Sequence, residues 1–108
     1  MKSIIQENKE ICYLCGKYGA NQCHHVMNGT SNRRKSEEDG LKIYVHKVCH
    51  DYIHEHELTD LNLKAKGQRI WQEYYNKSES DFIKRYGKNY IEKFEEWRNR
   101  NDKENINK

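Results

Sequence analysis

The stretch "CYLCGKYG", residues 12–19, decides how the first half of this chain folds. Its two cysteines, Cys12 and Cys15, are separated by two residues, and the glycines Gly16 and Gly19 follow them. This spacing is typical of a zinc knuckle, a tight turn in which two thiolates reach one metal ion. Glycine suits such a turn because it lets the backbone bend sharply beneath the metal. We therefore expect a structural metal site at this turn.

A second pair of ligands with the same spacing lies downstream, in "HKVC", residues 46–49. Tetrahedral zinc accepts two such pairs, so His46 and Cys49 are expected to complete the site begun by the two knuckle cysteines. Cys23 leaves an alternative open, because it either replaces His46 as the fourth ligand or is a buried thiol without a chemical role. The sequence thus predicts one structural Zn²⁺, with His46 favoured over Cys23.

The composition favours a small domain that a metal helps to stabilise. The 108-residue chain is 34% hydrophobic and 34% charged, so its apolar core is small, and zinc bound only by the folded chain adds to the folding free energy. The formal net charge of +3 is too weak to indicate a nucleic-acid partner by itself. The chain has no apolar run of membrane-spanning length, and its start lacks the apolar stretch of a signal peptide. We expect a cytoplasmic protein without membrane contact, whose reduced cysteines bind metal rather than form disulfides.

We expect a single α+β domain, because all cysteines and histidines precede residue 57 and the remainder has a helical pattern. Four segments are predicted: a flexible N-terminus over 1–10, a metal-binding core over 11–57, a helical extension over 58–98 and a polar tail over 99–108. Within the core, the expected order is a knuckle, a β-hairpin and a helix. The turn-rich segment "NGTSNRRKSEEDG" is predicted to be a long loop between the two hairpin strands.

The helical extension is expected to pack through its large apolar side chains. Four residues share one face of a first helix: Leu63, Ile70, Trp71 and Tyr74. Gly67 should weaken that helix locally. Ser78 and Asp81 match a capping box at the start of a short helix, which Gly87 can end. A last helix, from about Asn89, would bury three aromatic residues, for which packing is favoured over base stacking: Tyr90, Phe94 and Trp97.

Four histidines remain outside the predicted zinc site, and such a number is hard to explain by packing alone: His24, His25, His50 and His54. His50 and His54 are one helical turn apart, so they face the same side. His24 and His25 are neighbours on a strand and point to opposite faces, so they cannot easily bind the same ion. We expect one of these two to bind a divalent ion with His50 and His54, while the other takes a proton from water.

The motifs "CYLCG", "CHHV", "NGTSNRRKSEEDGL" and "HKVCHDYIH" together resemble the HNH nucleases, in particular the small zinc-knuckle proteins of phages and prophages. The resemblance covers roughly residues 11–57, and "GQRIWQEYY" and "FIKRYGKNYI" are similar to the helical tail of the phage group. It implies a ββα-metal (treble-clef) core around one divalent ion, Mg²⁺, Mn²⁺, Ni²⁺ or Zn²⁺, that contacts the scissile phosphate of DNA. The implied activity is phosphodiester hydrolysis, in the host cytoplasm if the chain is phage encoded.

This resemblance also implies roles for single residues. In the double-histidine motif the first histidine commonly binds the ion and the second is the general base, which makes His24 a ligand and His25 the base. His50 and His54 then complete the ligand set. The phosphate contacts suggested by the loop are Arg33, Arg34 and Lys35, although a solvated loop explains these charges equally well.

One departure from the family pattern concerns the middle asparagine, which would fall near Gly40. Asn28 and Asn32 are the candidates to replace its loop-fixing hydrogen bonds. The sequence does not choose between DNA and RNA, or between a monomer and a homodimer. A different function also fits the same scaffold: a catalytically inactive, zinc-stabilised nucleic-acid-binding module, or a phage protein that inhibits a host factor by protein–protein contact.

Overall fold

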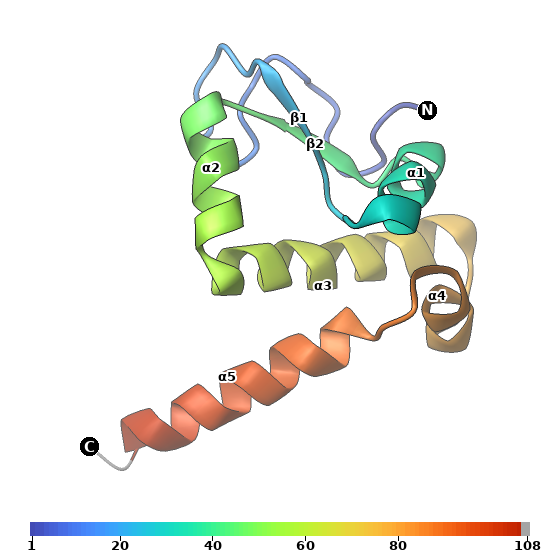
Figure 1. Cartoon of the computed structure of the whole chain (residues 1–108), viewed down its shortest axis with the longest axis vertical. Helices are drawn as coiled ribbons and strands as arrows, with labels where there is room; N and C mark the ends of the chain where they lie inside the picture. The colour runs from blue at the N-terminus through green and yellow to red at the C-terminus, as the bar shows by residue number, and fades with distance from the viewer. Residues whose placement is uncertain (107–108) are drawn as a thin grey trace.

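The computed structural model describes residues 1–106 and contains, within that span, two strands and five helices (Figure 1). In chain order they are β1 (Gln22–His25), α1 (Thr30–Asp39), β2 (Lys42–Val45), α2 (Lys47–Glu55), α3 (Glu57–Tyr75), α4 (Glu79–Tyr86) and α5 (Tyr90–Ile106). The two strands form an antiparallel sheet, so the expected α+β class is confirmed. No helix in this span is long and apolar enough to cross a membrane.

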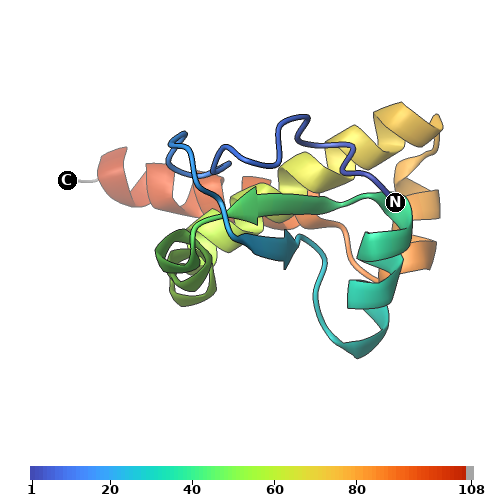
Figure 2. The same cartoon turned by 90° about the horizontal axis from the view of Figure 1, so that it is seen from above.

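The long helix α3 separates the sheet from α5. In Figure 1, α1 and α2 flank the sheet on one side of α3, and α5 runs along the other side. Figure 2 shows the two strands side by side in opposite directions, with α2 and α1 at their two ends. The core lies between the sheet and α3, where the buried residues include Ile43, Val45 and Leu63. α2 starts directly after β2 and packs against β1, which brings the histidines of this helix toward those of the strand.

The register of the sheet sets the direction of each histidine in β1. His24 is opposite Ile43 and His25 is opposite Lys42. Because successive side chains of a strand point to opposite faces, His24 is turned into the protein, where it is 2% exposed, and Cys23 is exposed. The two adjacent histidines therefore have different surroundings, as the sequence predicted.

The segment between the strands is helical, and the prediction of a long loop there was wrong. α1 contains only polar and charged residues, so it has no apolar stripe by which its helical period could be recognised. It is held by tertiary contacts through Ser36 and Asp39, which are buried. Gly40 ends it in a left-handed conformation with φ of 76°, and a Cβ at this position would collide with the Lys2 carbonyl oxygen.

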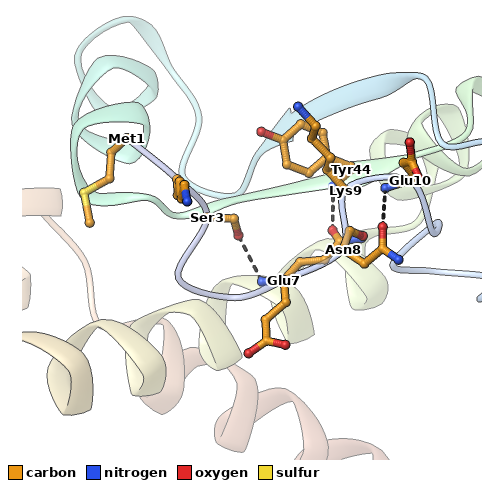
Figure 3. Close-up of a pocket in the computed structure, with 9 residues that line it drawn as sticks. Met1, Ser3, Glu7, Asn8, Lys9, Glu10 and Tyr44 are labelled. Carbon is orange, nitrogen blue, oxygen red and sulfur yellow. Dashed lines mark hydrogen bonds between the residues drawn. The ribbon is translucent and has the colours of Figure 1, made fainter.

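The N-terminal segment, which was expected to be flexible, is bonded along the outer edge of β2. The Ile4 N–H donates to the Gly40 carbonyl at 2.9 Å, and the Tyr44 N–H donates to Gln6 Oε1 at 2.7 Å. Ser3 Oγ donates to the Lys42 carbonyl. Figure 3 shows this segment passing beside Tyr44. Residues of the segment and Tyr44 line an open pocket of about 950 Å³. These bonds cover a strand edge that would otherwise present unpaired backbone groups.

The predicted apolar face of α3 is partly correct. Leu63 and Trp71 are buried and Ile70 is partly buried, whereas Tyr74 is 60% exposed. Gly67, expected only as a weak point, lies where the helix passes close to the chain after β1. A Cβ there would be 3.1 Å from Val26 Cγ1, so the glycine permits this approach. A residue that weakens the isolated helix therefore improves its packing.

The end of the chain follows the predicted helices with one extension. Ser78 and Asp81 form the expected capping box of α4, and Gly87 ends that helix with φ of 90°. Phe82 and Tyr86 are buried, and Tyr90 packs against the core, whereas Phe94 and Trp97 are only partly buried, so the expected burial of the α5 aromatic residues is confirmed in part. α5 continues to Ile106, so most of the segment predicted as a polar tail is helical; residues 107–108 lie outside the described part.

A buried carboxylate that the sequence did not reveal connects α1 to α3 and α4. Asp39 accepts hydrogen bonds from Trp71 Nε1 at 2.8 Å, from the Tyr86 hydroxyl at 2.6 Å and from Arg85 Nε at 2.5 Å. A buried charge of this kind is stable only when it is paired and hydrogen-bonded. The contact fixes the position of α1, and with it the side chains that α1 turns toward the sheet.

Candidate metal centres

The structure contains two clusters of potential metal ligands among the described residues, and both use side chains of α2. The first, called here the cysteine cluster, consists of Cys12, Cys15, His46 and Cys49, and its ligand atoms all lie within 4.8 Å of one another. The second, called the histidine cluster, consists of His24, His50 and His54, whose ligand atoms also lie within 4.8 Å of one another. The structure thus brings together both sets of residues that the sequence predicted as metal ligands.

The cysteine cluster is built from a turn and the start of α2. The Cys12 N–H donates to the Lys17 carbonyl at 2.8 Å and the Gly16 N–H donates to the Cys12 carbonyl at 2.9 Å, which closes the turn. Cys15 Sγ lies 3.3 Å from His46 Nδ1. Bonds of about 2.0–2.3 Å from one tetrahedral zinc put neighbouring ligand atoms roughly 3.3–3.8 Å apart. The cluster therefore has the donors and spacing of a site for a metal such as zinc.

His46 is oriented for this role by its second ring nitrogen. Its Nε2 lies 3.0 Å from the Tyr18 carbonyl oxygen, which accepts a hydrogen bond from it and so leaves the Nδ1 lone pair directed at the cysteines. His46 is the N-cap residue of α2 and so directly precedes the helix. Cys23 is exposed on β1 and does not belong to the cluster. Of the two alternatives for the fourth ligand, the structure places His46 beside the knuckle cysteines.

Two thiols of the cysteine cluster, Cys12 and Cys49, have pKa values shifted in opposite directions. Burial alone would raise the pKa of Cys12, but backbone hydrogen bonds from Cys15, His46 and Leu14 lower it to about 6. Burial, together with the nearby thiols of Cys12 and Cys15, raises the pKa of Cys49 to about 11. A bound Zn²⁺ would offset the repulsion between neighbouring thiolates, because its positive charge stabilises each thiolate that contacts it.

The histidine cluster joins the sheet to α2. His50 and His54 are one turn apart and their Nε2 atoms lie 3.1 Å from each other. The His24 ring approaches them from β1, with ring centroids 5.0 Å from His50 and 5.3 Å from His54. In this arrangement three imidazoles from two elements surround one point.

The environment of His24 keeps its imidazole neutral. Burial, and then the charges of His50 and His54, lower its pKa to about 3. Its Nε2 is buried and has no hydrogen-bond partner within the described residues. An unsatisfied buried polar atom costs about 1–3 kcal/mol, and coordination of a cation would remove that cost. Its neutral, unpaired nitrogen is the form of imidazole that binds a metal.

A cavity of about 160 Å³ opens beside these rings. Its lining residues are Cys23, His24, His25, Asn28, Arg33, His50 and His54. His25 belongs to this lining but not to the histidine cluster, and its side chain is 15% exposed. The cavity therefore presents three potential ligands and one further imidazole to whatever enters it.

The three basic residues considered as phosphate contacts have different positions. Arg33 lines the cavity. Arg34 is exposed and lies 3.7 Å from Glu38, one turn along α1. Lys35 Nζ donates to the Arg85 carbonyl at 2.8 Å, which ties α1 to α4. Only Arg33 of the three is placed at the cavity.

The connection between β1 and β2 is also held by a serine that the sequence did not indicate. Ser36 Oγ accepts the Met27 N–H at 3.2 Å and donates to the Leu41 carbonyl, so it joins the two ends of the connection between the strands. Asn32 Nδ2 instead donates to the Tyr86 carbonyl at 3.0 Å, and Asn28 lines the cavity. Asn32 thus ties the connecting segment to α4, and the loop-fixing role expected of Asn28 or Asn32 stays a prediction. A serine within a charged run carries no signal that could have found it.

No family model, no curated protein and no solved structure matches this chain. Inferences about its function therefore depend on the geometry of the two clusters and of the cavity.

Proposed function

We propose that this chain is a metal-dependent HNH-type endonuclease, with a treble-clef (ββα-metal) core, that hydrolyses phosphodiester bonds in DNA. The observation that carries the proposal is the separation of the adjacent histidines. His24 joins His50 and His54, while His25 lines the same cavity outside that cluster. A knuckle, a hairpin and a helix in this order support a ββα-metal core. In this proposal the cysteine cluster holds Zn²⁺ for stability and the histidine cluster holds the catalytic ion.

The proposed chemistry assigns one task to each group around the cavity. A divalent ion held by His24, His50 and His54 supplies positive charge for the phosphate and the leaving oxygen. His25 accepts a proton from the attacking water, because a neutral imidazole is a base near physiological pH. Arg33 neutralises a non-bridging phosphate oxygen and orients the ester. A single centre of this kind cuts one strand, so the expected product is nicked DNA.

A nicking assay on supercoiled plasmid tests the proposal, with Mg²⁺, Mn²⁺ or Ni²⁺ added separately. We expect nicking by the wild type and loss of at least about 100-fold in rate for His25→Ala, in line with the typical contribution of a general base. His56→Ala is the matched control, since His56 is exposed, stacks on Tyr52 and lies outside both clusters.

Circular dichroism of each variant shows whether the fold is kept. A folded His25→Ala protein that nicks at the wild-type rate would eliminate the proposed base. Retention of DNA in a gel shift without cleavage in any metal would instead favour the binding module. Neither retention nor cleavage would favour an inhibitor that acts by protein–protein contact.

A further inference from the structure

Glu37, a residue of α1, lies beside both His25 of β1 and Lys42 of β2. Its Oε1 lies 3.5 Å from His25 Nε2, and its Oε2 accepts a hydrogen bond from Lys42 Nζ at 2.5 Å. His25 and Lys42 are partners in the register of β1 and β2, so their side chains leave the sheet on the same face. The carboxylate therefore sits behind one ring nitrogen of the imidazole that lines the cavity.

We propose that Glu37 is a positioning residue, which holds the His25 imidazole with its proton on Nε2 so that the Nδ1 lone pair serves as the base. This inference rests on the proposed function, because it specifies how the same site prepares its base. A neutral imidazole has one donor and one acceptor nitrogen, and a carboxylate can only accept. A carboxylate beside Nε2 thus selects the tautomer whose free lone pair is on Nδ1.

The surroundings of Glu37 hold its charge and its position. The hydrogen bond from Lys42 lowers the pKa of Glu37, so the carboxylate is ionised at neutral pH. Lys42 is 7% exposed and its backbone is anchored in β2. α1 is fixed in turn by the buried contacts of Ser36 and Asp39. His25 Nε2 is buried and has no hydrogen-bond partner within the described residues, so the carboxylate is the group available to take its proton.

The distance of 3.5 Å is longer than the 2.7–3.2 Å of a formed N–H···O hydrogen bond. Contacts of this kind in enzymes are often long in the free protein and shorten in the complex with substrate. A competing explanation is that Glu37 serves only to neutralise the buried ammonium of Lys42. The experiment must therefore separate a role toward His25 from a role toward Lys42.

The first arm of the test measures the tautomer of His25 directly and does not depend on cleavage. Nitrogen–proton correlation NMR of ¹⁵N-labelled protein, at a pH where the ring is neutral, should show the proton on Nε2 in the wild type. Glu37→Gln keeps the size of the side chain and can still accept from Lys42, but its amide can also donate to the ring. We expect this variant to show a mixture of tautomers, and Glu38→Gln, the control, to match the wild type. A wild-type proton on Nδ1, or an unchanged pattern in Glu37→Gln, would overturn the inference.

The second arm measures nicking kinetics. We expect Glu37→Gln to lose at least about tenfold in kcat, with KM changed by less than about twofold, because outer partners of this kind typically contribute 10- to 100-fold. The double variant Glu37→Gln with Lys42→Met should remain as slow as Glu37→Gln. Recovery of the wild-type rate in the double variant would show that neutralising Lys42 was the sole role and would overturn the inference. Absence of nicking by the wild type in every metal would reject the nuclease, and the tautomer measurement alone would then decide the contact.

Discussion

His50 and His54 hold their Nε2 atoms 3.1 Å apart on one face of α2. Their approach brings two imidazoles against the buried ring of His24, and the three rings leave a nitrogen of His24 without a partner among the described residues. Protonated rings at this separation repel one another, whereas neutral rings can all donate a lone pair to one shared cation. We therefore expect the stability of the protein to depend on pH through His24, and on a divalent ion if the proposed site binds one.

Acid should destabilise the protein through His24 when no divalent ion is added. In the folded chain the pKa of His24 is lowered to about 3, mainly by burial, whereas an unfolded histidine has a pKa of 6.5. The unfolded state therefore binds the proton first, and stability present above pH 6.5 falls as the pH decreases toward 3. The expected slope is roughly 1.4 kcal/mol per pH unit between about pH 6 and pH 4.

Urea denaturation of the wild type and of His24→Gln, at a series of pH values from about 7 to about 4, measures this slope. His24→Gln should have the shallower dependence on pH by about the amount above, and His56→Gln should follow the wild type. Equal slopes in the wild type and in His24→Gln would contradict the proposed burial of a neutral imidazole.

Added divalent ion should stabilise the protein through the histidine cluster. A ligand that binds only the folded state at 100 times its Kd raises the free energy of unfolding by about 2.7 kcal/mol. Thermal melts with Ni²⁺ should therefore show a higher Tm for the wild type and for His56→Ala, and little change for His50→Ala. If His50→Ala were stabilised by Ni²⁺ as much as the wild type, the ion would bind elsewhere.

Zinc should depend on the cysteine cluster and not on Cys23. Elemental analysis is expected to find about one zinc per wild-type chain. Cys12→Ser and Cys15→Ser should lose the metal and cooperative unfolding, because structural zinc contributes directly to folding free energy. Cys23→Ser should keep both, since Cys23 is exposed on β1 and lies outside the cluster. Loss of zinc in Cys23→Ser would contradict this assignment of ligands.

Ser36 should matter more for stability than its place in a charged helix suggests. Ser36→Ala removes the acceptor of the Met27 N–H and the donor to the Leu41 carbonyl, both in buried surroundings. Leaving buried polar groups unpaired costs about 1–3 kcal/mol, so we expect that loss in urea denaturation. Ser31→Ala, an exposed change in the same helix, is the control and should cost less than about 0.5 kcal/mol. Equal effects of the two changes would rule out a loop-fixing role for Ser36.

Short spacings along the chain were enough to predict which nearby side chains can share one ion, while the resemblance to the HNH nucleases implied that His24 joins His50 and His54. A separation of two residues between Cys12 and Cys15, and of one helical turn between His50 and His54, fixes which side chains can share an ion wherever the segment lies. Alternation along β1 likewise separates His24 from His25. Local geometry sets these relationships, so the order of the residues suffices to predict them.

The neighbours of each of these groups depend instead on tertiary packing. The helical form of α1 could not be predicted from its sequence, because helices are recognised by an apolar stripe and α1 has none. Its position depends on Asp39 meeting Trp71 and on Ser36 meeting both ends of the connection between the strands. That position places Glu37 behind His25 and Arg33 at the cavity. Contacts between segments far apart in the chain are set by packing and buried hydrogen bonds, which no local pattern in this sequence records.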